Sequence, residues 1–176
     1  MKSTASNILV KKKKQILETW MQLQLQDESL REDLISNEEL RGQSDELLTS
    51  LLIAIQNDNY SDVNTSDFEQ IFDVLSGISI SRAKQGFSPR ETGVYVLSLK
   101  EALFKSLEAG LKDDIQKLYE ESIKISKLMD DLTVATFETF IKGREEVILR
   151  QTDEITEIST PVIRVWDGIL ALPIIG

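Results

Sequence analysis

The sequence of 176 residues contains no cysteine and no histidine. Without cysteine the chain has neither a disulfide framework nor a thiolate metal site. Without histidine it lacks the usual proton shuttle and the usual partner of a catalytic nucleophile, as well as the common axial ligand of haem. We therefore expect a protein that is not an enzyme, with no catalytic residue, no metal site and no cofactor.

Aromatic residues and prolines are scarce, at 6% of the chain and three positions respectively. This composition favours helices over β-sandwiches or barrels. The formal net charge of −10 argues against a general affinity for nucleic acid. No apolar run approaches the roughly 20 residues that span a bilayer, and the N-terminus has no hydrophobic signal core. The expectation is a cytoplasmic, all-α protein without nucleic-acid or membrane partners.

Charged clusters are present, but each is typical of a helix surface. Adjacent carboxylates such as Glu120 and Glu121 could serve acid–base chemistry, although solvation on a helix surface is the favoured interpretation. The basic run of residues 11–14 could touch an anionic membrane or nucleic acid. Its position within an amphipathic helix of an acidic protein favours a solvated helical turn.

Apolar spacing and capping residues predict about five helices. The first three are expected over residues 6–26, from Ser36 or Asn37 to residue 55, and from Thr65 or Ser66 to about Gly86. The clearest start signal is the segment Ser88-Pro89-Arg90-Glu91, which offers a serine cap, a proline in the first turn and a glutamate that closes a capping box. A fourth helix therefore begins after Ser88.

Residues 111–158 contain no proline and one glycine, which predicts one very long helix or two nearly collinear ones. Its first half carries a packing seam consisting of Leu111, Ile115, Leu118, Ile125, Met129 and Leu132. Its second half carries a row that recurs every seven residues, namely Val134, Ile141, Ile148 and Ile155. Phe137 and Ile158 lie in the companion row, which Arg144 and Gln151 interrupt. We expect dimer or stalk contacts at Phe137, Ile141, Ile148 and Ile155.

The C-terminal segment has a strand pattern instead. The dipeptide Asp167-Gly168 separates two apolar runs, which is a strong signal for a β-hairpin with strands at residues 161–166 and 169–175. An isolated hairpin is not stable in water. The expectation is that a β-containing domain continues beyond Gly176.

Five aromatic residues come from three of the predicted helices. They are Trp20, Phe68, Phe72, Tyr95 and Phe104. They could line an apolar pocket for a lipid-like small molecule, but the favoured interpretation is that they form core.

The helical layout and the C-terminal segment from Pro161 to Gly176, PVIRVWDGILALPIIG, resemble the RsbR-type stressosome proteins, which are RsbT co-antagonists. The resemblance implies a globin-like, non-haem sensor domain over residues 1–132, a linker or stalk helix over 133–160, and the start of a truncated STAS domain over 161–176. It also implies a homodimer, and contacts with STAS-domain partner proteins and a serine kinase through the missing C-terminal domain. The expected function is a signalling and scaffold domain, and the alternative is a receptor domain for a lipid-like ligand.

Overall fold

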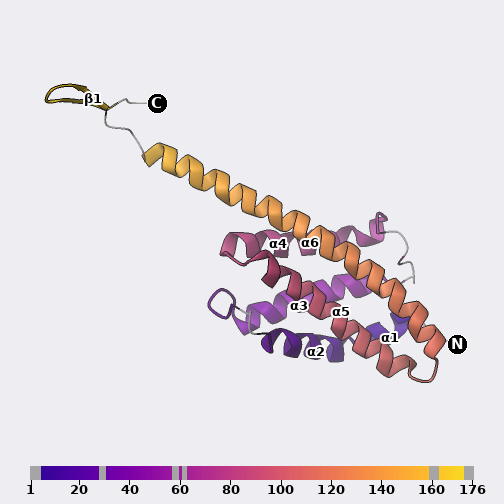
Figure 1. Cartoon of the computed structure of the whole chain (residues 1–176). Helices are drawn as coiled ribbons and strands as arrows, with labels where there is room; N and C mark the ends of the chain where they lie inside the picture. Colours follow the sequence, from indigo (N-terminus) through magenta and orange to yellow (C-terminus); the bar gives the residue numbers. More distant parts are fainter. Residues whose placement is uncertain (1–4, 28–30, 57–59, 61–62, 159–162, 173–176) are drawn as a thin grey trace.

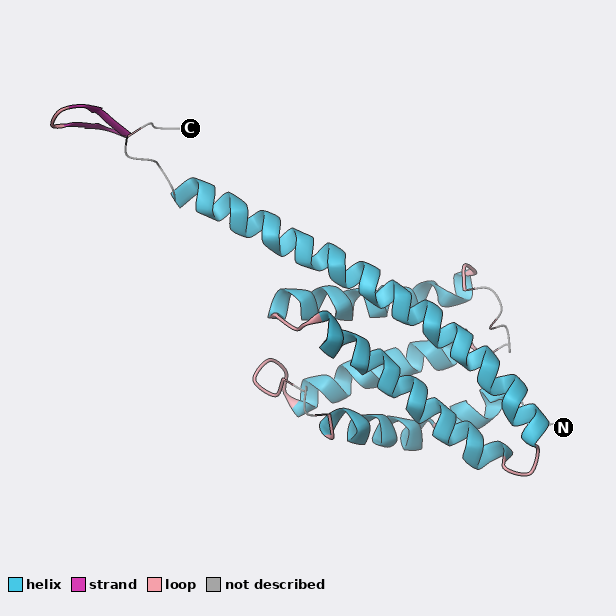
Figure 2. Cartoon of the chain, viewed as in Figure 1, coloured by secondary structure: helices cyan, strands magenta, loops and turns pink. Residues whose placement is uncertain are grey.

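The structure is a computed structural model that describes residues 5–27, 31–56, 60, 63–158 and 163–172. Within these ranges it consists of helices followed by a two-stranded hairpin (Figures 1 and 2). The elements in chain order are α1 Ala5–Lys11, α2 Lys13–Leu25, α3 Asn37–Ala54, the short 3₁₀ helix η1 Ser66–Phe68, α4 Glu69–Gln85, α5 Pro89–Leu111, α6 Ile115–Ile158, β1 Ile163–Trp166 and β2 Ile169–Ala171. The predicted helical fold, with a long last helix and a hairpin, is confirmed.

The predicted capping residues start and end the central helices. Ser36 precedes α3, and its hydroxyl accepts a hydrogen bond from the backbone N–H of Glu39 at 3.2 Å. Before α5, the Ser88 N–H donates to the Glu91 carboxylate at 2.6 Å, and the Glu91 N–H donates to the Ser88 hydroxyl at 3.2 Å. Gly86 ends α4 with a φ of 96°, a conformation that glycine adopts without strain.

Two local predictions are wrong. The first helix is divided at Lys12, whose ammonium group lies 3.4 Å from the Ser106 carbonyl of α5. Ile115, predicted to lie in the packing seam, is 79% exposed because it begins α6 at the edge of the bundle. The seam residues farther along α6, from Ile125 to Leu132, are buried as predicted.

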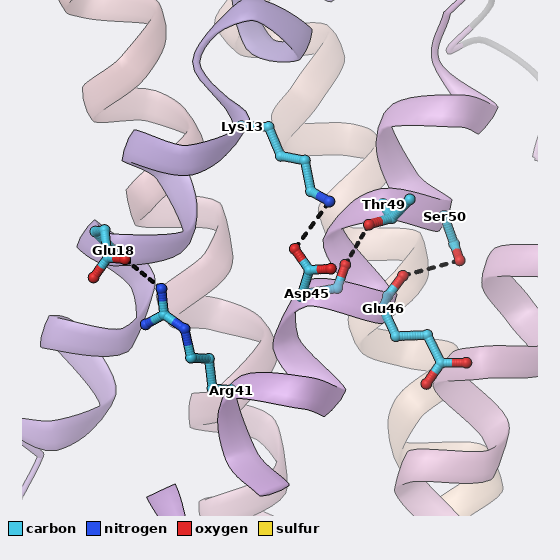
Figure 3. A network of polar contacts seen from close by, with 7 residues as sticks. All are labelled: Lys13, Glu18, Arg41, Asp45, Glu46, Thr49 and Ser50. Atoms are coloured by element: carbon cyan, nitrogen blue, oxygen red, sulfur yellow. Dashed lines mark hydrogen bonds and ion pairs between the residues drawn. The ribbon is translucent and has the colours of Figure 1, made fainter. Parts of the chain in front are cut away.

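The helices form a bundle in which α6 lies across α4 and α5, while α2 packs against α5 and α3 (Figure 1). Surface ion pairs join α2 to α3: Lys13 lies 2.9 Å from Asp45, and Arg41 contacts Glu18 (Figure 3). Exposed pairs of this kind add little stability. The bundle is therefore held mainly by its apolar core.

Two glycines allow close helix packing against α6. A Cβ on Gly143 would lie 3.0 Å from the Cβ of Ala83 and 3.2 Å from the Cα of Ile80, so α6 and α4 approach each other closely there. A Cβ on Gly93 of α5 would lie 2.6 Å from the ring of Phe137 on α6. These contacts fix α6 against both of its neighbours.

The last part of α6 extends beyond the bundle (Figure 1). Val147 is buried, and residues 148–156 are all exposed. The final ion pair between α6 and the bundle joins Glu146 to Lys84 at 3.3 Å. At 1.5 Å per residue, the projecting segment from residue 148 to residue 158 is about 16 Å long.

The hairpin forms at the predicted turn. β1 and β2 are antiparallel, with Ile163 opposite Ala171 and Arg164 opposite Leu170. Gly168 has a φ of 79°, as the turn requires. Residues 161–162 and 173–175, which were also predicted as strand, lie outside the described residues. Across the part of the chain that the structure describes, no helix has the length and apolar character needed to span a bilayer.

Gly143→Ala should destabilise the protein, although alanine has the higher intrinsic helix propensity. The added Cβ meets Ala83 and the backbone of Ile80, so α4 and α6 must separate and lose packing. We expect the free energy of unfolding in urea to fall by about 1–2 kcal/mol. Gly42→Ala is the matched control, because a Cβ at that exposed helical position meets nothing within 4 Å. It should raise stability by about 0.5–1 kcal/mol, and equal stability of the two variants would contradict the close crossing.

Candidate functional site

A buried tryptophan anchors the polar centre of the bundle. Trp20 of α2 is fully buried, and its indole N–H donates to the Tyr95 carbonyl and to the Ser98 hydroxyl, each at 3.0 Å. The rings of Trp20 and Tyr95 are tilted by 40°, with centroids 4.9 Å apart. This contact joins α2 to α5.

Arg82 of α4 also contacts Tyr95. Its guanidinium carbon lies 4.0 Å from the Tyr95 ring centroid and 4.9 Å from that of Phe87, distances suited to cation–π attraction. We call Trp20, Tyr95, Arg82 and Phe87 the aromatic–arginine stack. The stack connects α2, α5, α4 and the turn between α4 and α5.

Arg82 is an unusual residue for a protein interior. Its side chain is 2% exposed, and among the described residues neither Nε nor Nη2 has a hydrogen-bond partner. A buried donor without a partner costs about 1–3 kcal/mol, and more when the group is charged. The two flanking rings offset part of this cost.

The local sequence places these side chains together. On α4, Ile71, Leu75 and Ile78 occupy the buried face, and Arg82 follows four residues after Ile78 on that face. The left-handed turn at Gly86 then brings Phe87 back over Arg82. The capping box that follows starts α5, from which Tyr95 extends inward.

A small cavity lies beside the stack. Its volume is about 20 Å³. The lining residues are Gln24, Asp27, Arg82, Phe87, Glu91, Val94 and Tyr95. One water needs about 10–15 Å³ of such space, so the cavity accepts one or two water-sized groups. A lipid-like ligand is too large for it, and the receptor alternative is not favoured.

Burial also changes the acid–base properties of the stack. Desolvation raises the pKa of Tyr95 to about 12, although the charge of Arg82 and a hydrogen bond from Ser44 oppose the shift. Burial lowers the pKa of Arg82 below its ordinary value, against the attraction of Tyr95, Glu91 and Glu39. Because arginine titrates so far above neutrality, Arg82 remains a cation at pH 7.

The five predicted pocket residues do not gather at one site. Trp20 and Tyr95 meet in the stack, and Tyr95 lines the cavity. Phe68 is buried in the core, Phe72 lies half-buried beside a surface groove, and Phe104 is half-buried with its ring centroid 6.0 Å from the Lys100 ammonium group. Sequence reasoning missed Arg82 and Phe87, although a charged residue on the apolar face of α4 was an available signal.

The row on α6 that recurs every seven residues is the second candidate site. Val134, Ile141, Ile148 and Ile155 are 58%, 54%, 54% and 66% exposed. At 100° per residue, this row lies on the side of α6 roughly opposite its buried residues Leu132 and Gly143. Phe137, predicted to belong with these contacts, is half-buried against Gly93 of α5.

Comparison with known families gives a match over most of the chain. Residues 14–155 match the family described as the RsbT co-antagonist protein rsbRD N-terminal domain. The match crosses the boundary predicted between residues 132 and 133, which stays a prediction. Neither a curated protein nor a solved structure matches this chain.

The wild type should lose stability at alkaline pH because of Tyr95, and Tyr95→Phe should remove this loss. An unfolded tyrosine has a pKa of about 10, whereas that of Tyr95 is raised to about 12. The unfolded chain therefore releases this proton first, and the stabilising contribution is complete below pH 10 and lost as pH rises toward 12. The slope is at most about 1.4 kcal/mol per pH unit.

Urea unfolding at several values from about pH 8 to about pH 11 measures this slope. The stability of the wild type should fall more steeply than that of Tyr95→Phe. Tyr119→Phe changes a 67% exposed tyrosine and should keep the wild-type slope. If Tyr95→Phe also kept it, the raised pKa would be contradicted.

Proposed function

The chain belongs to the family of RsbT co-antagonist protein rsbRD N-terminal domains, and from this membership we propose that it is the signalling and scaffold domain of a stressosome regulator in the bacterial general stress response. In this role it modulates a serine kinase through an attached STAS domain, in the cytoplasm. The domain transmits a signal by a change of packing, and its own residues carry out no catalysis.

The observation that carries the proposal is the exposed apolar row on the outer side of α6. One side of the helix packs on α4 and α5, and the other exposes the row from Val134 to Ile155. A helix that belonged only to this bundle would carry polar residues on its outer side. The row therefore favours a partner helix, and a second copy of the chain supplies a matching one.

Parallel pairing of two α6 helices explains the spacing of the row. Apolar residues every seven positions stay in register when two helices supercoil around each other. In a two-fold dimer, Ile141 and Ile148 of one protomer lie opposite the same residues of its partner. Phe137, which lies half-buried against Gly93, contacts the edge of this seam.

The hairpin is consistent with the attached STAS domain. Several large apolar side chains in β1 and β2 are more than half exposed, including Ile163, Trp166, Ile169 and Leu170. Side chains of this kind are covered when further strands and helices complete a domain. In the proposed mechanism, paired α6 helices pass a change in bundle packing to the two STAS domains, which contact STAS-domain partner proteins and the kinase.

Ile148→Asp should weaken the homodimer. It introduces a carboxylate at the centre of the apolar seam, where pairing would remove that charge from water without a compensating partner. Light scattering over a concentration series should give a wild-type dimer and a dissociation constant raised at least tenfold in the variant, equivalent to about 1.4 kcal/mol or more. Ile141→Asp should behave in the same way.

Leu149→Asp is the matched control for this experiment. Leu149 is 65% exposed on the same helix, but it points about 100° away from Ile148. It makes the same change of charge outside the seam and should leave the dissociation constant unchanged. An unchanged constant for Ile148→Asp, or equal weakening by Leu149→Asp, would count against pairing through the row.

A further inference from the structure

We propose that the cavity beside the aromatic–arginine stack binds a small, singly charged planar oxyanion of the formate class, held by the guanidinium of Arg82. Binding of the anion does not depend on the function proposed above. A role of the anion as a signal rests on that function. The ligand class follows from the unpaired donors, the size of the cavity and the charges that surround it.

The donors come from Arg82. Its side chain lines the cavity and is 2% exposed, and among the described residues its Nε and Nη2 have no hydrogen-bond partner. Tyr95 and Phe87 contact the guanidinium at 4.0 and 4.9 Å. With two rings against the group, the in-plane N–H donors remain for a ligand. Planar oxyanions accept two parallel hydrogen bonds from such an edge.

Size and charge limit the anion that Arg82 can bind to a small, singly charged one. The cavity of about 20 Å³ fits a group of few atoms. Two carboxylate residues, Asp27 and Glu91, also line it. Glu91 already caps the start of α5, because its carboxylate accepts a hydrogen bond from the Ser88 N–H at 2.6 Å. Nearby negative charge disfavours phosphate or a dicarboxylate more strongly than a singly charged anion.

A ligand in the cavity would lie close to the contact between α4 and α6. Arg82 is followed by Ala83, which is one of the two α4 residues that Gly143 of α6 approaches. The cavity is lined by residues of α5 and the end of α2 as well as by Arg82. An anion bound there joins the ends of three helices and acts next to the α4–α6 crossing.

The test is a formate titration of the full chain, followed by ¹⁵N NMR of the arginine Nε–H signals, with sodium chloride replaced by sodium formate at constant ionic strength. The signal of Arg82, identified by its loss in Arg82→Met, should shift and saturate with formate. Arg41→Met removes an exposed arginine paired with Glu18 and should leave the formate response intact. A shift that chloride reproduces, or that does not saturate, would overturn the proposal.

A second measurement does not depend on assigning the signal. Formate should raise the melting temperature of the wild type and of Arg41→Met above that in chloride, and this gain should be lost in Arg82→Lys, which keeps the charge but not the planar donors. An equal gain in Arg82→Lys would overturn the proposal. Light scattering distinguishes formate binding from the pairing of α6 helices. A dimer that does not respond to formate would refute the ligand proposal alone. A monomer that responds to formate would refute the paired helices alone.

Discussion

The packing of α6 against α4 and α5 determines the rest of the architecture. Leu128, Leu132 and Phe140 fill this contact, and the missing side chain of Gly143 lets the helices approach closely. Protein interiors are packed at the density of organic crystals, so a crossing this close leaves little freedom for relative movement. Once α6 is held in this orientation, its outer row must face away from the bundle, and its last turns must extend past it.

Features encoded within a few residues were predictable from sequence. The capping box at Ser88, the glycine at the end of α4 and the turn at Asp167-Gly168 depend on local backbone geometry. The break at Lys12 and the exposure of Ile115 were not predictable in this way, because both depend on where neighbouring helices lie. The candidate site was predictable in part. Trp20 and Tyr95, which contact each other, were both among the expected aromatic residues. The role of Arg82 was not predictable, because the rings that contact it come from other segments of the chain.

The aromatic–arginine stack shows how a charge is accommodated in a small helical core. Arg82 lies against the rings of Tyr95 and Phe87, while the indole N–H of Trp20 donates a hydrogen bond to the backbone carbonyl of Tyr95. Replacement of a buried charge by an apolar side chain often leaves stability unchanged or improves it. Packing alone therefore does not account for an arginine at this position. Nε and Nη2 of Arg82, which have no partner among the described residues, are available to a group that supplies acceptors.

The straight extension of α6 has a mechanical consequence. Between Gly143 and Ile158 the helix rises about 22 Å, and after Val147 its described side chains are exposed. This segment acts as a lever whose fulcrum is the close crossing with α4. A tilt of about 5° at the fulcrum displaces the far end by about 2 Å, because a helix transmits rotation along its length without bending sharply. A small rotation inside the bundle thus becomes a displacement of about 2 Å at the end of α6.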